Sequence, residues 1–332
     1  MAFGPARRPL SAGGGSSGDS GAASGTRVAG STAVGDAFGL GCAPIGNLYR
    51  PLADDDAVAT VERALERGIR FFDTAPHYGA GASEQRLGRA IAGVDRDAVV
   101  IATKVGRRVV DADGAAVPVG GIGTDTVADL SRDGILRSLE GSLRRLGTDR
   151  VDLLHLHDPH HDVDGALRTA VPALVELRDQ GVVRSIGVGI GWSAPLARFV
   201  REAPVDVVMI AGRMTLIDRT AEDELLPDAI RHGVGVIAAG VFNSGVLADP
   251  VGAPYFDYKP ASDEQVERAL RLQRACAAYG VALPHAAARF PLRREPVEAV
   301  VVGARTPAEV DDFVDGASVE IPDALWQELE RG

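Results

Sequence analysis

Three residues that can move a proton follow two apolar segments of the chain. Asp73 and Tyr78 lie in the stretch Asp73-Thr74-Ala75-Pro76-His77-Tyr78-Gly79, directly after one apolar segment, and Lys104 closes the next one. A carboxylate can hold an ammonium group, and we expect the field of the ammonium to lower the pKa of the phenol from about 10 toward neutrality. A tyrosine in that setting exchanges protons with a substrate oxygen. Taken singly, Asp73 could instead cap a helix and Tyr78 could be a packed aromatic residue.

The position of Lys104 is informative because lysine is so rare in this chain. Of 35 basic residues, only Lys104 and Lys259 are not arginine. A compact ammonium can be partly buried where a planar guanidinium cannot. We therefore interpret Lys104 as a functional group, the alternative being an ordinary solvated charge.

A third set of candidate groups is the run His155-Leu156-His157-Asp158-Pro159-His160-His161. In a strand, His155 and His157 would share one face, which also suits a metal-dependent hydrolase. Such a site needs further ligands from other strand ends, and none is evident, so no metal is predicted. The favoured interpretation has His157 alone orienting a substrate oxygen, with His155 as a deeper core residue. The remaining histidines fall in loops or in or near helices: His160, His161, His232 and His285.

The elements that must position these groups alternate in type along the chain. Amphipathic helical segments separate eight β-rich apolar segments: Phe38–Ala43, Ile69–Phe72, Val99–Thr103, Val151–Leu156, Val183–Val188, Val205–Ile210, Val234–Ala239 and Ala299–Val302. This alternation is typical of a parallel sheet, and eight units in roughly 300 residues favour a (β/α)8 TIM barrel over an open sheet. The active site of such a barrel lies beyond the C-terminal ends of its strands. The segment from Val105 to Leu130, rich in Gly and Asp, is expected to form a loop over that site.

Composition limits the possible partners and compartments. The net charge of −11, with acidic residues scattered along the chain, argues against nucleic acid and an anionic membrane as partners and favours a small-molecule substrate. Two cysteines, Cys42 and Cys276, offer no disulfide framework, and we expect a cytoplasmic location. Residues 1–35 are low in complexity, lack the apolar run of a signal peptide and are predicted to be a flexible tail, with residues 36–332 as one barrel domain.

In order and context, Asp73, Tyr78, Lys104 and His157 resemble the catalytic tetrad of the aldo-keto reductase family, and the resemblance runs from about Phe38 to Asp312. Further stretches are similar to the branch that contains L-fucose, D-threo-aldose and L-galactose 1-dehydrogenases and pyridoxal 4-dehydrogenase. They are Ala43-Pro44-Ile45-Gly46-Asn47-Leu48-Tyr49, Ala211-Gly212-Arg213-Met214-Thr215-Leu216, Gly240-Val241-Phe242-Asn243-Ser244-Gly245 and Val302-Gly303-Ala304-Arg305.

The resemblance implies an oxidoreductase that uses NAD or NADP. In the oxidative direction, hydride leaves C1 of a cyclic aldose, Tyr78 takes the hydroxyl proton and a lactone forms, while Lys104, held by Asp73, stabilises the tyrosinate. A general aldehyde or ketone reductase and a pyridoxal 4-dehydrogenase are alternatives within the family. Outside it, a metal-dependent barrel hydrolase and a non-catalytic, cofactor-binding regulatory barrel are less favoured.

The resemblance also implies which residues contact the cofactor and the substrate. At some of these positions the chain differs from the residues usual in the family. Gly189-Ile190 replaces the usual Ser-Asn, and Ala239 replaces a tyrosine that stacks on the nicotinamide, a surface that Phe242 or Trp192 would supply. Glu309 replaces an arginine that binds the 2′-phosphate, so we expect NAD to be used at least as well as NADP. The expected cofactor contacts are Ala43, Asp73, Gly189, Phe242, Asn243, Ser244, Gly245, Gly303, Ala304, Arg305, Thr306 and Glu309. The candidate substrate contacts, all near strand C-termini, are Tyr49, His77, Trp192, Arg213 and Met214.

Overall fold

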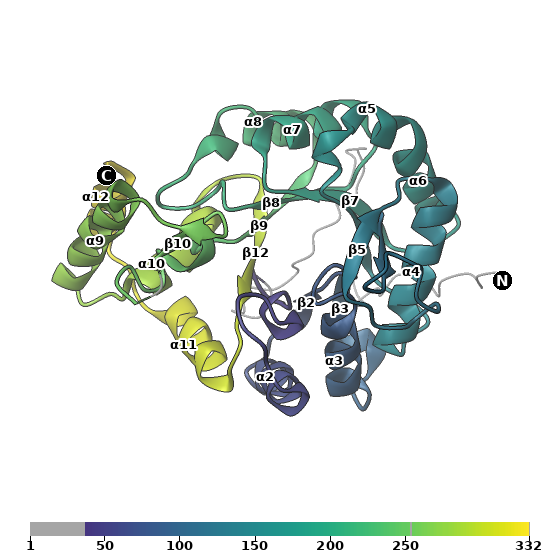
Figure 1. Cartoon of the computed structure of the whole chain (residues 1–332). Coiled ribbons are helices and arrows are strands. Elements are labelled where there is room, and N and C mark those ends of the chain that lie inside the picture. The colour runs from purple at the N-terminus through teal and green to yellow at the C-terminus, as the bar shows by residue number, and fades with distance from the viewer. Residues whose placement is uncertain (1–36, 253, 332) are drawn as a thin grey trace, which may run out of the picture.

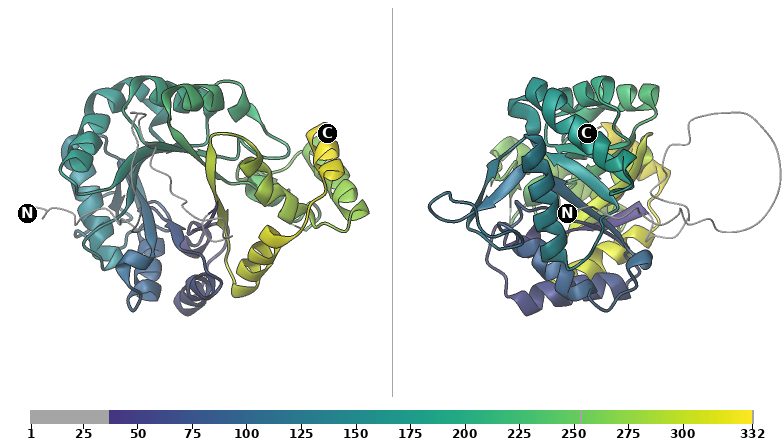
Figure 2. Two further views of the ribbon diagram at one scale, coloured as in Figure 1. Left: turned by 180° about the vertical axis from the view of Figure 1, so that it is seen from behind. Right: turned by 90° about the vertical axis from the view of Figure 1, so that its right-hand side faces the viewer.

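The structure, a computed structural model, describes residues 37–252 and 254–331, and its centre is a closed barrel of eight parallel strands with helices around it (Figures 1 and 2). The barrel follows chain order and closes where the first strand pairs with the last. This confirms the predicted (β/α)8 TIM barrel; the predicted N-terminal tail, residues 1–35, lies outside the described residues. The strands are β1 (Phe38–Gly41), β2 (Phe71–Asp73), β3 (Val100–Val105), β6 (Leu153–His157), β7 (Ser185–Ile190), β8 (Val207–Ala211), β9 (Gly235–Ala239) and β12 (Val297–Gly303).

Several strands begin and end later than their apolar segments predict. Val151 and Val183 were expected to open strands, but β6 begins at Leu153 and β7 at Ser185. Both valines are buried outside the ladder. Hydrophobicity therefore reports their burial and does not show where strand pairing begins.

Two apolar cores lie on opposite faces of the strands. Phe71 belongs to the cluster inside the barrel, whereas its neighbour Phe72 belongs to the larger cluster between the strands and the helices. Successive strand residues point to opposite faces, so a buried closed sheet needs apolar side chains on both. The continuous apolar runs of the sequence are the consequence.

Glycine residues terminate two helices of the outer layer. Helix α4 ends before Gly147 and α8 ends before Gly233, and both glycines adopt the left-handed conformation that terminates a helix. The main helices are α2 (Asp54–Glu66), α3 (Ala82–Ile91), α4 (Arg132–Leu146), α6 (Val171–Asp179), α7 (Ser193–Glu202), α8 (Leu225–His232), α9 (Asp263–Ala278), α10 (Leu283–Arg289), α11 (Pro307–Ser318) and α12 (Asp323–Arg331).

The segment after β3, which was expected to form a loop over the site, has secondary structure of its own. It contains an antiparallel hairpin of β4 (Arg107–Val110) and β5 (Asp125–Ala128). A second, shorter hairpin follows β9 and consists of β10 (Tyr255–Phe256) and β11 (Lys259–Pro260). Both hairpins follow the C-terminal ends of barrel strands, so they can contribute to the mouth of the barrel.

A buried ion pair joins two helices to the barrel. The Arg145 Nε of α4 donates to Glu84 Oε2 of α3 at 2.7 Å, and the Thr103 hydroxyl of β3 donates to Glu84 Oε1 at 2.6 Å. The Glu84 side chain is fully buried and that of Arg145 nearly so. A buried charge is stable only when it is paired and hydrogen-bonded, so this cluster fixes how α3 and α4 pack against β3.

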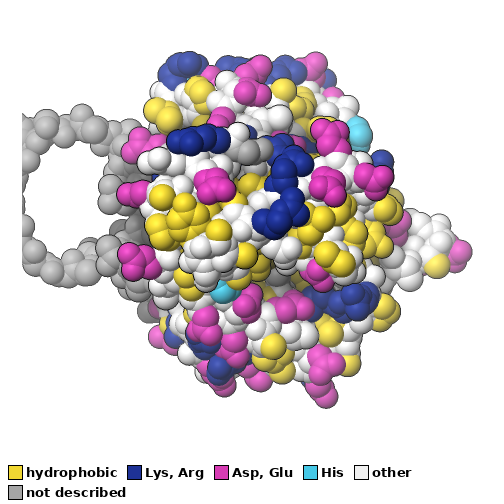
Figure 3. Space-filling view, turned by 90° about the vertical axis from the view of Figure 1, so that its left-hand side faces the viewer, with side chains coloured by type: hydrophobic (Ala, Val, Ile, Leu, Met, Phe, Trp, Pro, Cys, Tyr) yellow, Lys and Arg dark blue, Asp and Glu magenta, His cyan; other side chains and the backbone are white. Residues whose placement is uncertain are grey.

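Two features concern the surface of the protein and its relation to a membrane. Acidic and basic side chains are mixed over the face shown in Figure 3. Among residues 37–252 and 254–331, no helix is long and apolar enough to cross a bilayer.

Candidate active site

Four polar side chains meet at the C-terminal ends of three neighbouring strands. Asp73 ends β2, Lys104 lies near the end of β3, His157 ends β6, and Tyr78 lies in the turn after β2. The Lys104 Nζ donates to both Asp73 carboxylate oxygens, at 2.8 and 2.7 Å, and contacts the Tyr78 hydroxyl at 2.9 Å. The structure thus brings together the three groups that the sequence placed after β2 and on β3.

The pKa of Tyr78 differs from the expectation. Burial raises the pKa of the Tyr78 phenol well above its usual value, and the charge of Asp73 raises it further. The Lys104 ammonium is only 2.9 Å away, but it is shared with the Asp73 carboxylate. The pKa of Tyr78 is therefore not brought toward neutrality as expected, because burial and the charge of Asp73 raise it.

His157 is a neutral ring beside that phenol. Its ring lies edge-on to the Tyr78 ring, with 5.8 Å between the centroids. Burial lowers the pKa of His157 well below its usual value, and the nearby charge of Lys104 lowers it further. A neutral imidazole can donate one hydrogen bond to a substrate oxygen without adding a charge to the site.

His155 is the deeper core histidine that the sequence predicts. It is fully buried one step below His157 on β6, and burial lowers its pKa to about 3. Neither of its ring nitrogens has a hydrogen-bond partner in the described part of the chain. The same part contains no group of three or more His, Cys, Asp or Glu side chains placed to hold a metal ion.

The backbone of Tyr78 is held by a close approach to Gly46, in the turn Pro44–Gly46 after β1. A Cβ atom at Gly46 would lie 2.7 Å from the Tyr78 carbonyl carbon and 2.8 Å from its oxygen. The backbone N–H of Tyr78 donates to the carbonyl oxygen of Ala75, and the carbonyl oxygen of Tyr78 accepts from the backbone N–H of Ser83. The absence of a side chain at Gly46 therefore allows the backbone position of Tyr78 that places its phenol next to Lys104.

We expect Gly46→Ala to lower kcat by about 100-fold, because a displacement near 1 Å of a catalytic group has an effect of that order. The added methyl group must push the Tyr78 backbone away, while the affinity for the cofactor should change little. Steady-state kinetics and the thermal midpoint of unfolding check this. Gly93→Ala is the matched control, because a Cβ there has no neighbour within 4 Å. A Gly46→Ala enzyme with the kcat of the parent would contradict the assignment.

The candidate substrate residues differ in where they lie. The His77 Nδ1 is 2.6 Å from the Thr126 hydroxyl of β5, and the His77 ring packs against His157 with 5.8 Å between centroids. Tyr49 is half exposed and stacks on Tyr258, with 6.1 Å between ring centroids. Met214, in contrast, is 1% exposed and packs in the outer core. We therefore leave Met214 out of the proposed substrate contacts.

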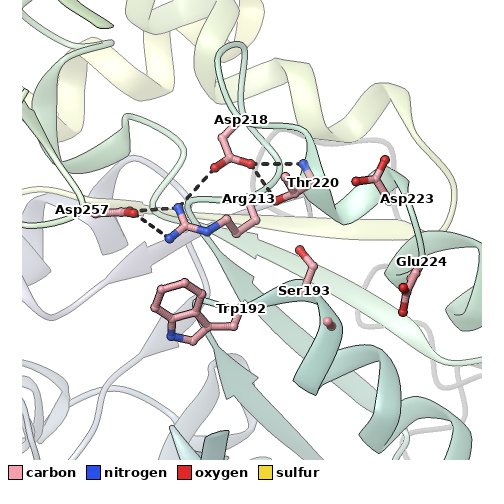
Figure 4. A pocket seen from close by; sticks show the side chains of 9 residues that line it. Trp192, Ser193, Arg213, Asp218, Thr220, Asp223, Glu224 and Asp257 are labelled. Carbon is pink, nitrogen blue, oxygen red and sulfur yellow. Dashed lines mark hydrogen bonds and ion pairs between the residues drawn. The ribbon is translucent and has the colours of Figure 1, made fainter. Parts of the chain in front are cut away.

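Arg213 and Trp192 lie together at the ends of β8 and β7. The Arg213 guanidinium makes a bidentate ion pair with Asp257, at 2.9 and 2.6 Å, and lies 5.4 Å from the centre of the Trp192 ring. Figure 4 shows both contacts in the wall of a cavity. The charge of Arg213 is thus already paired with a carboxylate.

The turn after β12 has the features of a binding site for the phosphate end of a dinucleotide. Thr306 caps helix α11, and the N-terminus of a helix attracts phosphate. Arg305 is partly buried at this turn, where its guanidinium adds a positive charge beside the end of the helix. Glu309 lies at the same turn, where its Oε2 accepts the Arg305 N–H at 2.8 Å. The chemistry of this turn fits NAD(P). The Glu309 carboxylate affects whether the turn favours NAD or NADP.

The nicotinamide end of the expected site has few side chains of its own. Gly189 lies next to Lys104, where a Cβ would be 3.8 Å from the Lys104 Cε, and the partly buried Ala239 ends β9. Phe242 is partly buried at the start of the turn Asn243–Gly245, and Asn243 donates from Nδ2 to the Gly212 oxygen at 2.9 Å. Ala43 follows β1, Gly303 ends β12 and pairs with Gly41, and Ala304 comes directly after it.

Sequence reasoning missed Asp257, Tyr258 and Thr126, which all come from the two hairpins. Tyr258 stacks on the candidate substrate residue Tyr49, with 6.1 Å between the ring centroids. Asp257 and Tyr258 both have positive φ angles, which non-glycine residues rarely adopt and which occur often at functional sites. Nothing in the sequence pattern signals that conformation.

Comparison with known proteins agrees with this geometry. Residues 37–331 match the model of the aldo/keto reductase family. The chain is 44% identical over 306 residues to D-threo-aldose 1-dehydrogenase from a Pseudomonas species, covering 88% of this chain and 92% of that one. It is 37% identical over 317 residues to pyridoxal 4-dehydrogenase from Microbacterium luteolum, with the same coverages. It is 32% identical to L-galactose dehydrogenase from Arabidopsis thaliana, covering 84% and 83%.

Solved structures show the same relationship. An aldo-keto reductase from Bacillus halodurans, in its holo form, superposes with a TM-score of 0.72 at 26% identity and covers 89% of this chain and 90% of that one. The barrel with its Asp-Tyr-Lys-His site defines an oxidoreductase of the aldo-keto reductase type. The chain belongs to the aldo/keto reductase family, whose enzymes use NAD(P)H.

Proposed function

We propose that the protein oxidises C1 of a free aldose of the L-fucose or D-threo-aldose kind to a lactone, with NAD or NADP as the hydride acceptor. The observation that carries the proposal is the contact of Lys104 with both Asp73 and Tyr78, in a chain 44% identical to a D-threo-aldose 1-dehydrogenase. When bound, the nicotinamide supplies the acceptor for the hydride. The residues of the chain orient the substrate and move its proton.

In this proposal Tyr78 takes the proton of the C1 hydroxyl and His157 donates a hydrogen bond to a substrate oxygen. Because the pKa of Tyr78 is raised, the phenol must first lose its own proton before it can accept another. The Lys104 ammonium favours the tyrosinate by its charge and its hydrogen bond. The rate of oxidation is therefore expected to rise with pH, and the rate of reduction, in which Tyr78 donates, to be greatest where the phenol is protonated.

Two alternatives within the family have specific support. A protonated Tyr78 suits a proton donor, which is the role it would have in a general aldehyde or ketone reductase. Pyridoxal 4-dehydrogenase from Microbacterium luteolum is 37% identical to this chain. Initial rates in both directions, with sugars, pyridoxal and simple aldehydes, separate these activities.

We propose that NAD is used at least as well as NADP, because the Glu309 carboxylate is held against the turn where the 2′-phosphate would lie. The negative charge of the Glu309 carboxylate would repel that phosphate. Glu309→Arg is expected to shift the ratio of kcat/KM toward NADP by about tenfold, which corresponds to 1.4 kcal/mol. Assays with the two cofactors at equal concentration measure the shift, and Glu320→Arg, at an exposed acidic position, is the control. A strong NADP preference of the parent protein would contradict the proposal.

A further inference from the structure

A cavity of about 420 Å³ lies at the ends of β7 and β8 (Figure 4). Its wall includes Trp192 from the end of β7, Arg213 and Asp218 from the segment after β8, and Asp257 from the hairpin after β9. Asp223 and Glu224 line it from the segment that leads into α8. None of the four catalytic side chains is among its lining residues.

Two contacts connect this cavity to the catalytic centre. Asp257 lines the cavity, and the next residue, Tyr258, stacks on Tyr49 of the segment after β1, with 6.1 Å between the ring centroids. The Trp192 ring lies 6.2 Å from the ring of His160, three residues beyond His157. The cavity therefore lies at the same end of the barrel as the catalytic centre, on the side toward which a substrate longer than its reacting carbon would extend.

The charges of the cavity wall are strongly unbalanced. The only guanidinium among the described lining residues is that of Arg213, which pairs with Asp257 at 2.6 Å and contacts Asp218 at 3.4 Å. Asp223 and Glu224 add two more carboxylates. Arg201 lies 3.7 Å from Glu224, but it also forms an ion pair with Asp228, so its charge is shared. The wall as a whole is anionic.

The remaining chemistry of the wall suits hydroxyl groups. Carboxylate oxygens only accept hydrogen bonds, and a sugar hydroxyl can donate one to each of them. Trp192 is 53% exposed, and its ring offers an apolar face for C–H groups. A phosphate in the cavity would be repelled by the carboxylates of the wall, and such like-charge repulsion weakens binding strongly.

We propose that this cavity receives an uncharged, hydroxyl-rich part of the substrate and discriminates against phosphorylated sugars. The inference rests on the proposed function and names the residues that would confine it to free sugars. Asp223 and Glu224 are the residues that determine this specificity, and Trp192 supplies the surface on which the carbon chain packs.

The test compares L-galactose with L-galactose 6-phosphate, in which the added group leaves the pyranose ring intact. Binding is measured by calorimetry with saturating reduced cofactor, so that no turnover is needed. We expect the phosphate ester to bind at least tenfold more weakly, with a difference that shrinks as salt is added. The double variant Asp223→Asn/Glu224→Gln should reduce the difference in affinity between the two sugars. Asp149 is an exposed acidic residue before β6, and Asp149→Asn should leave that difference unchanged.

Equal binding of the two sugars by the parent protein would overturn the inference, and so would binding of neither. An unchanged difference in the double variant would also overturn it. Failure of the proposed function is a separate result: no reduced cofactor would form with any free sugar, whichever sugar binds more tightly.

Discussion

Replacing Lys104 by methionine is expected to lower kcat by about 10²- to 10⁴-fold, the range found when a general acid–base group loses its function. The Lys104 ammonium contacts Tyr78 at 2.9 Å and is the cation nearest to the phenol in the described structure. Removing it takes away the charge that favours the tyrosinate, so the pKa of Tyr78 rises further. The rise of the oxidation rate with pH should move to higher pH, and a pH profile of kcat measures that shift.

The buried Asp73 requires a second variant in this experiment. Without Lys104, its carboxylate would be left unpaired in the core, and loss of one partner of a buried pair destabilises a protein strongly. Lys104→Met/Asp73→Asn removes both charges, so it should fold better than the single variant and remain equally inactive. Lys259→Met, at the other lysine, which is exposed, should retain activity. An active Lys104→Met enzyme with an unchanged pH profile would refute the role given to Lys104.

Replacing Arg145 by methionine is expected to lower the free energy of unfolding by about 3–5 kcal/mol, because it leaves the Glu84 carboxylate buried without its cation. The Thr103 hydroxyl would remain as a single donor to that carboxylate. Helix α3 follows the turn that holds Tyr78, so part of the catalytic activity should be lost as well. Urea denaturation of the purified protein measures the change.

The adjacent arginine is a matched control for this prediction. Arg144 is half exposed and pairs with Glu140 one turn away at 2.7 Å, so Arg144→Met should cost only about 0.3–0.5 kcal/mol. Adding Glu84→Gln to Arg145→Met should restore part of the loss, since no buried charge then remains. Similar stabilities of the Arg144 and Arg145 variants would show that the buried pair does not hold α3 and α4.

The barrel and the meeting of Asp73, Tyr78, Lys104 and His157 at its mouth could be predicted because the relevant signals are local. Asp73, Lys104 and His157 each follow or close a buried apolar run, and parallel strands bring their C-terminal ends to one mouth. The strand starts were less accurate, because residues such as Val183 are buried without pairing in the ladder.

The rest of the site depends on interactions between distant segments. Arg213 pairs with Asp257, 44 residues away, through a hairpin whose two-residue strands give no periodic signal. The pKa of Tyr78 depends on how fully the phenol is buried and how the Lys104 charge is divided, and neither can be inferred from residue types. Likewise, the role of Gly46 depends on the approach of two turns that are 32 residues apart in the sequence.

The most direct test of the account is the initial rate of NADH or NADPH formation with L-fucose, L-galactose, D-arabinose and pyridoxal, measured for the parent protein and for Tyr78→Phe. We predict turnover of at least one free sugar by the parent protein and its loss in Tyr78→Phe, which keeps the ring but removes the hydroxyl that contacts Lys104. Undiminished turnover in Tyr78→Phe, or no turnover of any sugar by a folded parent protein that binds the cofactor, would contradict the proposed function.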